Sequence, residues 1–338
     1  MHKLLQGSML LFATAGTLIG GGLFCFWLFL HQPGSATLES KVIMVQPGLT
    51  VREISRLLAA EGVVSDPRLF RILSRLRKAD QNLQAGEYRM TTTMTPEQVL
   101  AILEAGKGIV HRVTFPEGST LEDVARILAE ARLADREVLL SWMHNADFFR
   151  SLGLNADTLE GYLFPNTYHF LRSQSPTTML REMVRQFHRQ VEPQWRQRPV
   201  AAPNLSLHQT VILASLVEKE AATSAERPII ASVFRNRLNF GMKLQSDPTA
   251  VYDLEGFSGP VTGEHLKRDS RYNTYLHRGL PPGPICNPGL ASLAAAMTVT
   301  EVPYLYFVSN LDGTHTFSET LAEHQLAVRE YRWKLERE

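Results

Sequence analysis

The chain reads KVIMVQPGLTVREISRLL over residues 41–58 and HRVTFPEGSTLEDVARIL over residues 111–128, and the two stretches repeat one order of features. In each stretch a strand-like apolar run leads into a turn with proline and glycine, and a threonine then precedes an amphipathic pattern. In the first copy Glu53 follows Thr50 by three residues, which is the spacing of a capping box at the start of a helix. The repeat predicts two strand–turn–helix units, and therefore an α+β fold with short strands.

The composition excludes several classes of protein. At 338 residues the chain is long enough for two or three domains, and its 44% hydrophobic content is that of a folded protein. A net charge of +1 gives no basic excess, so nucleic acid is not expected as a partner. The two cysteines, Cys25 and Cys286, form no metal-binding or redox pattern, and we expect neither a metal nor a cofactor.

The N-terminal segment predicts a membrane anchor. No charged residue occurs from Met9 to Leu30, which is about the 20 residues that a helix needs to cross a bilayer core. Lys3 precedes the segment and favours a cytoplasmic N-terminus. A cleaved signal peptide is the alternative, although its apolar region is normally about 7–15 residues long. We expect residues 1–8 to be cytoplasmic, residues 9–30 to form a single transmembrane helix, and the remainder to lie outside the cytoplasm.

The rest of the chain divides at its turn and break signals. Residues 31–40 are predicted to be a polar linker, residues 41–110 a β/α subdomain, and residues 111–338 a mainly helical domain that begins with the second repeat unit. Helices are expected at 67–77, 139–152, 176–198 and 206–222, with a break at 199–203.

The stretch SLHQTVILASLVEKEAA, residues 206–222, is predicted to be one apolar helix that ends in two acids. Glu218 and Glu220 point about 200° apart, so only one of them can face a given cleft. The residues that share the face of Glu218 are mostly small, and they are Val211, Ala214, Ser215, Ala221 and Ala222. The face of Glu220 carries bulkier residues. Room for a saccharide favours Glu218 as an acid, whereas the alternative is that both acids are simply the solvated end of a core helix.

Polar and aromatic loops of the kind that line carbohydrate clefts follow this helix. They are MKLQSDPT at 242–249, YNTY at 272–275, GLPPGPI at 279–285 and NPG at 287–289. With these segments in this order, the chain from about residue 41 to 326 resembles the YceG-like family of endolytic murein transglycosylases. The repeated units resemble the LysM glycan-binding module, in which a strand leads into a helix pair.

The resemblance implies an enzyme of the bacterial inner membrane with its catalytic domain in the periplasm. It implies cleavage of the β-1,4 bond between N-acetylmuramic acid and N-acetylglucosamine inside glycan strands, with 1,6-anhydro ends and with Glu218 as the catalytic acid. It also implies action on nascent strands near peptidoglycan synthases. Our candidates for holding the sugar are Gln245, Ser246, Asn273 and Tyr275.

Two other functions stay open at this point. A hydrolytic muramidase would need a second carboxylate, for which Asp247 and Glu160 are the candidates. A non-catalytic glycan-binding scaffold would use the LysM-like units, and Glu218 would then be structural.

Overall fold

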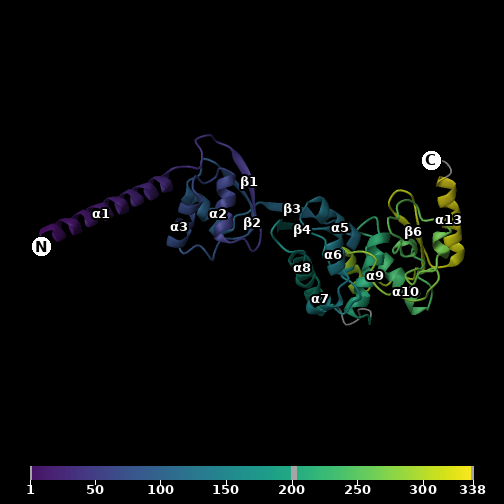
Figure 1. Ribbon diagram of the computed structural model, residues 1–338. Coiled ribbons are helices and arrows are strands. Elements are labelled where there is room, and N and C mark those ends of the chain that lie inside the picture. The colour runs from purple at the N-terminus through teal and green to yellow at the C-terminus, as the bar shows by residue number, and fades with distance from the viewer. Residues whose placement is uncertain (1, 199–203, 336–338) are drawn as a thin grey trace. The chain divides into compact units, whose positions relative to one another are not determined.

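A computed structural model describes residues 2–198 and 204–335 and divides the chain into two compact units (Figure 1). Unit 1 comprises the chain through His111 together with His169–Gln174, and unit 2 comprises Arg112–Tyr168 and the chain from Ser175 onward. The mixture of helices with short two-stranded sheets confirms the predicted α+β class.

Unit 1 is built on an antiparallel strand pair. Its elements are α1 (His2–His31), β1 (Ser40–Val45), α2 (Val51–Ala60), α3 (Pro67–Leu76), β2 (Gly86–Thr91) and α4 (Pro96–Ala105). Ser40 lies opposite Thr91 in the register, and Val45 lies opposite Gly86. Ile43, Phe70 and Tyr88 are fully buried in the core that β1, α3 and β2 share. A strand followed by two helices is the order expected for a LysM-like unit, and the likeness to LysM stays a prediction.

The repeated turn is built in the same way in both copies. Thr50 accepts a hydrogen bond from the Glu53 amide while the Glu53 carboxylate accepts one from the Thr50 amide, so the predicted capping box is confirmed. Thr120 and Asp123 form the same reciprocal pair at the start of α5 (Leu121–Glu130). Each box satisfies amides that the first turn of a helix leaves without a partner.

The predicted membrane-spanning segment falls within α1. Over the residues that the structure describes, no helix combines the length and apolar character needed to cross a membrane. The helix is therefore present, but the predicted span of residues 9–30 is not confirmed.

Unit 2 is mainly helical. Besides α5, its helices are α6 (Arg136–Met143), α7 (Ala146–Ser151), α8 (Pro176–Arg196), α9 (Leu207–Glu220), α10 (Arg227–Asn239), α11 (Asp247–Val251), α12 (Leu290–Met297) and α13 (Leu321–Leu335), with a 3-10 turn at His265–Lys267. Strand β5 (Tyr306–Ser309) of unit 2 pairs antiparallel with β6 (His315–Ser318). Strands β3 (Val110–Thr114) and β4 (Thr167–Leu171) pair with each other, and each has residues in both units.

One predicted helix differs from the structure, and one predicted break cannot be compared with it. The helix predicted over 139–152 is two helices, because the Asn145 side chain accepts the Phe148 amide and begins α7 anew. The predicted break at 199–203 lies outside the described residues.

Helix α9 is the centre of unit 2. Every residue from Thr210 to Val217 is buried, and α9 packs against α10 and α12. The helix is covered on all sides along this stretch. The face with small residues and the face with bulky residues are therefore both buried. The middle of the helix contacts the 279–285 loop, where the Ile285 amide donates to Ser215 Oγ at 3.1 Å, and its last turn carries Glu218 and Glu220 to the loops that follow.

Candidate functional site

The last turn of α9 carries Glu218 in a polar niche that is closed to bulk water. Its side chain is only 5% exposed. The Gly289 amide donates to Glu218 Oε2 at 2.9 Å, and Arg227 Nη2 donates to Glu218 Oε1 at 3.2 Å. Because each carboxylate oxygen accepts a hydrogen bond, the carboxyl plane of Glu218 is fixed.

Arg227 is itself held on several sides at the start of α10. Its Nε donates to Ser292 Oγ on α12 at 2.9 Å, and its Nη1 donates to Ser224 Oγ at 2.8 Å. Its Nη2 also lies 3.8 Å from Glu117 Oε2, so the guanidinium faces two carboxylates. These contacts fix the guanidinium opposite Glu218.

The turn of the second repeat unit forms a wall of the niche. Gly118 has φ +77°, and a Cβ at this position would lie 3.6 Å from Glu218 Cγ. The Gly118 amide donates to the Asn287 carbonyl at 2.9 Å, and the Asn287 amide donates to the Ser119 carbonyl at 2.8 Å. These two backbone bonds join the turn to the NPG loop, and together they place the Gly289 amide against Glu218.

Glu160, a candidate for a second catalytic carboxylate, is 2% exposed and supports these loops from inside. It accepts from the Leu121 amide at 3.2 Å, from the Tyr252 hydroxyl at 2.9 Å and from Asn287 Nδ2 at 3.1 Å. Burial raises its pKa to about 7, although its bonds to Leu121 and Tyr252 oppose that rise. With both oxygens engaged inside the protein, Glu160 is placed to hold the NPG loop.

Glu220 has a different environment on the other side of the helix. Ser246 Oγ donates to Glu220 Oε1. Burial raises the pKa of Glu220 to about 7, and the nearby Asp247 acts in the same direction, whereas the hydrogen bond from Ser246 and the charges of His315 and Arg237 oppose the rise. Burial therefore makes Glu220 harder to ionise than an exposed glutamate.

The structure connects the predicted sugar-binding residues to Glu220 and its loop. Ser246 is buried, and its hydroxyl donates a hydrogen bond to Glu220. Asn273 is fully buried, and its amide group donates to the Leu266 carbonyl at 3.1 Å and the Arg268 carbonyl at 2.8 Å. Both side chains are therefore engaged in shaping the loops.

The other two predicted residues are accessible. Gln245 is exposed and has φ +50°, and Tyr275 is half-buried with its hydroxyl donating to Asp247 Oδ1. All four residues remain predictions as sugar contacts. No pattern in the sequence singled out Arg227 or Glu117, because their relation to Glu218 exists only in the folded chain.

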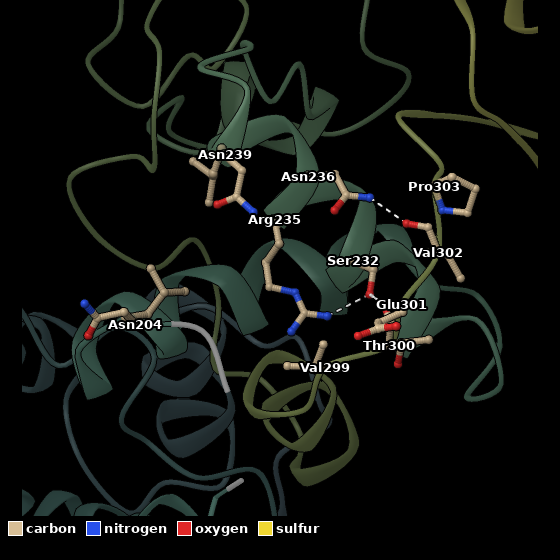
Figure 2. A pocket seen from close by; sticks show the side chains of 12 residues that line it. Asn204, Ser232, Arg235, Asn236, Asn239, Val299, Thr300, Glu301, Val302 and Pro303 are labelled. Carbon is tan, nitrogen blue, oxygen red and sulfur yellow. Dashed lines mark hydrogen bonds between the residues drawn. The ribbon is translucent and has the colours of Figure 1, made fainter. Parts of the chain in front are cut away.

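A cavity of about 650 Å³ lies along another side of α10 and does not include Glu218. Figure 2 shows Ser232, Arg235 and Asn236 of α10 facing the segment 299–303, with Asn236 bonded to the Val302 carbonyl. Within the described residues, no three His, Cys, Asp or Glu side chains are grouped so that they could hold a metal ion.

Comparisons with known proteins agree on one family. The model of the YceG-like family matches residues 43–330. The chain is 31% identical over 332 residues to the endolytic murein transglycosylase of Bacillus subtilis, with 93% of this chain and 91% of that protein covered. It is 27% identical to the endolytic murein transglycosylase of Streptococcus pneumoniae serotype 2, with 93% and 63% covered. A crystal structure of a YceG-like protein from Listeria monocytogenes is similar at a TM-score of 0.58 and 31% identity, with 86% of this chain and 99% of that chain covered.

Proposed function

Because the chain belongs to the YceG-like family, we propose that it is an endolytic lytic transglycosylase that cleaves the β-1,4 bond between N-acetylmuramic acid and N-acetylglucosamine in peptidoglycan. The relatives named endolytic murein transglycosylase support the reaction class. The observation that carries the assignment of the site is Glu218, a carboxylate that is 5% exposed and bonded on both oxygens where α9 meets two loops.

One carboxyl group is sufficient for this reaction. Protonated Glu218 donates its proton to the glycosidic oxygen as the bond to the anomeric carbon breaks. The resulting carboxylate takes the proton of the muramic 6-hydroxyl, whose oxygen bonds to the anomeric carbon and closes the 1,6-anhydro ring. The 2-acetamido group stabilises the cationic centre, so no protein nucleophile is needed. The Gly289 amide and Arg227 both donate to the charged form of Glu218, which supports its role between the two proton transfers.

A hydrolytic muramidase is the second candidate, and the surroundings of Glu160 and Asp247, the two acids predicted for it, do not favour it. Such an enzyme places a second carboxylate where it can meet water or the anomeric carbon. Glu160 is enclosed by three donors, and Asp247 accepts from Tyr275 on the Glu220 side of the helix. Neither acid shares a hydrogen-bonding partner with Glu218 among the contacts above.

The ends of the glycan products test the proposal. Purified chain should release interior fragments whose new ends are one water lighter than hydrolysed ends and resist borohydride reduction, as read by mass spectrometry. Reducible muramic ends as the main product would assign a muramidase. Binding without cleavage would assign a scaffold, the remaining alternative.

The cellular location is part of the proposal and rests on the uncharged run from Met9 to Leu30. We place the catalytic domain in the periplasm, anchored at the inner membrane, where it acts on nascent strands near the synthases that make them. A reporter that is active only in the periplasm, fused to the C-terminus, should give signal. A silent fusion that is stably expressed would overturn this location.

A further inference from the structure

The proposed acid, Glu218, shares the Arg227 guanidinium with a second carboxylate, that of Glu117. Arg227 Nη2 lies 3.2 Å from Glu218 Oε1 and 3.8 Å from Glu117 Oε2. The Arg227 side chain is 11% exposed and the Glu117 side chain is 49% exposed, so water screens the second pair more than the first. The arrangement is asymmetric, with a close inner pair and a looser outer acid.

The same two acids also meet at Gly289. The Gly289 amide donates to Glu218 Oε2. A Cβ added to Gly289 would overlap the Glu117 carboxyl group, so the absence of a side chain leaves the space that Glu117 occupies. Glu117 is therefore packed against the residue and the guanidinium that both bind Glu218.

We propose that Arg227 and Glu117 are positioning residues that together set the protonation balance of Glu218. The proposal rests on the function proposed above, in which Glu218 must be neutral to donate and charged to accept within one turnover. A buried arginine with one carboxylate partner favours the charged form of that partner strongly. A second carboxylate on the same guanidinium weakens this preference, because its negative charge disfavours another negative charge nearby.

The other charged or titratable groups around Glu218 do not give this balance. Lys219 follows Glu218 on α9, and its Nζ lies 4.0 Å from a Cβ placed at Gly118, but the residue is exposed and water screens its charge. Cys286 interacts with Glu218 electrostatically, but burial raises the pKa of its thiol, so it stays neutral. Ser292 and Ser224 fix the guanidinium without adding charge. Arg227 and Glu117 are the ionic partners that the niche places against the acid.

The test is the pH dependence of kcat/KM for glycan cleavage by the full chain. The first step needs protonated Glu218, so activity falls on the alkaline limb as that proton is lost. Arg227→Met removes the positive charge that favours the carboxylate, so the alkaline limb should move to higher pH by about 1 unit or more. Arg227→Lys keeps the charge and should restore most of the wild-type limb. Glu117→Gln leaves Arg227 wholly to Glu218, so the limb should move to lower pH by a few tenths of a unit.

The matched control is Glu122→Gln. It removes the same charge from a 57% exposed carboxylate whose partner is Arg136, and it should leave the limb in place. Opposite shifts in Arg227→Met and Glu117→Gln support the proposal. If both variants shift the alkaline limb in the same direction, or neither shifts it, the proposal is wrong. The proposed function still holds in that case if Glu218→Gln is inactive. If Arg227→Met does not fold, the comparison of the alkaline limbs of Glu117→Gln and Glu122→Gln tests the proposal by itself. Cleavage by Glu218→Gln would instead defeat the proposed function.

Discussion

Glu218 and Glu220 stand two residues apart on α9, and their hydrogen-bonding partners differ in kind. Glu218 is bonded to an arginine and a backbone amide, whereas Glu220 is bonded to the Ser246 hydroxyl. Glu218→Gln keeps the size of the side chain but removes the transferable proton. General acid–base groups contribute about 10²–10⁴-fold, and a sole acid and base belongs at or above the top of that range. We expect glycan cleavage by Glu218→Gln to be undetectable in a mass-spectrometric product assay.

Glu220→Gln is the internal control for that substitution. A glutamine oxygen can still accept the Ser246 hydroxyl, so the loop should hold its place and the rate should change less than tenfold. If Glu220→Gln is inactive while Glu218→Gln still cleaves, the catalytic assignment belongs to the other side of the helix.

Glu220 also predicts a pH dependence of stability. Its pKa is raised in the folded state from 4.5 to about 7, so the folded state binds the proton more tightly than the unfolded state. This contribution to the free energy of unfolding is fully present below pH 4.5, is lost as the pH rises to about 7, and stays constant above that. Urea denaturation across this window should show a smaller decline for Glu220→Gln than for wild type. Equal declines would show that the proton on Glu220 is not linked to folding. The pKa of Glu160 is also raised to about 7, so Glu160 accounts for part of the wild-type slope.

At the scale of elements, local signals were enough for α9 and its neighbours. The apolar run predicted a helix over 206–222, and α9 spans Leu207–Glu220 with Ser206 as the cap that the structure reveals. The split of 139–152 was missed because α6 ends at Met143 with His144 as its C-cap, and the Asn145 side chain caps the start of α7 two residues later. Short-range patterns predict elements well when the cap and the hydrophobic period lie within one stretch.

The attachment of each loop to each acid could not be predicted. Ser246 bonds Glu220 across 26 positions, and the Gly289 amide bonds Glu218 across 71. Such pairs depend on how the elements pack, which no local pattern encodes. The motifs at 242–249 and 287–289 were predicted to be loops beside a site, although residues 247–249 begin the short helix α11. Which acid each motif serves is visible only in the fold.

Two glycines allow a test of how closely the loops pack on α9. Gly161 has φ +87°, and a Cβ there would lie 2.6 Å from Pro284 Cγ and 2.7 Å from Val211 Cγ1. Gly153 has φ +78° but nothing within 4 Å of such a Cβ. Gly153→Ala should cost about 1–2 kcal/mol for the left-handed backbone alone. Gly161→Ala should cost about 1–3 kcal/mol more, because it also overpacks a closed contact. Equal losses in chemical denaturation would contradict the close approach.

At the scale of the whole molecule, the chain has two compact units, and each has its own buried core. Phe70 lies fully buried in unit 1, and Phe187 lies fully buried in unit 2. The niche around Glu218, with Glu117, Arg227 and Gly289, is contributed by unit 2 alone. Damage to the core of unit 1 should therefore leave the geometry of the niche intact.

Separate cores predict separate unfolding, and a matched pair of substitutions tests it. Replacing a buried phenylalanine by alanine costs about 3–5 kcal/mol through lost burial and the cavity that remains. In calorimetry, Phe70→Ala should lower the transition of unit 1 and Phe187→Ala that of unit 2, each leaving the other transition in place. Below both transitions, Phe70→Ala should keep wild-type kcat on short glycan fragments, because the proposed acid and its partners lie in unit 2. A single transition that both substitutions lower together would show that the two cores unfold as one cooperative structure, and it would make the niche depend on unit 1 as well.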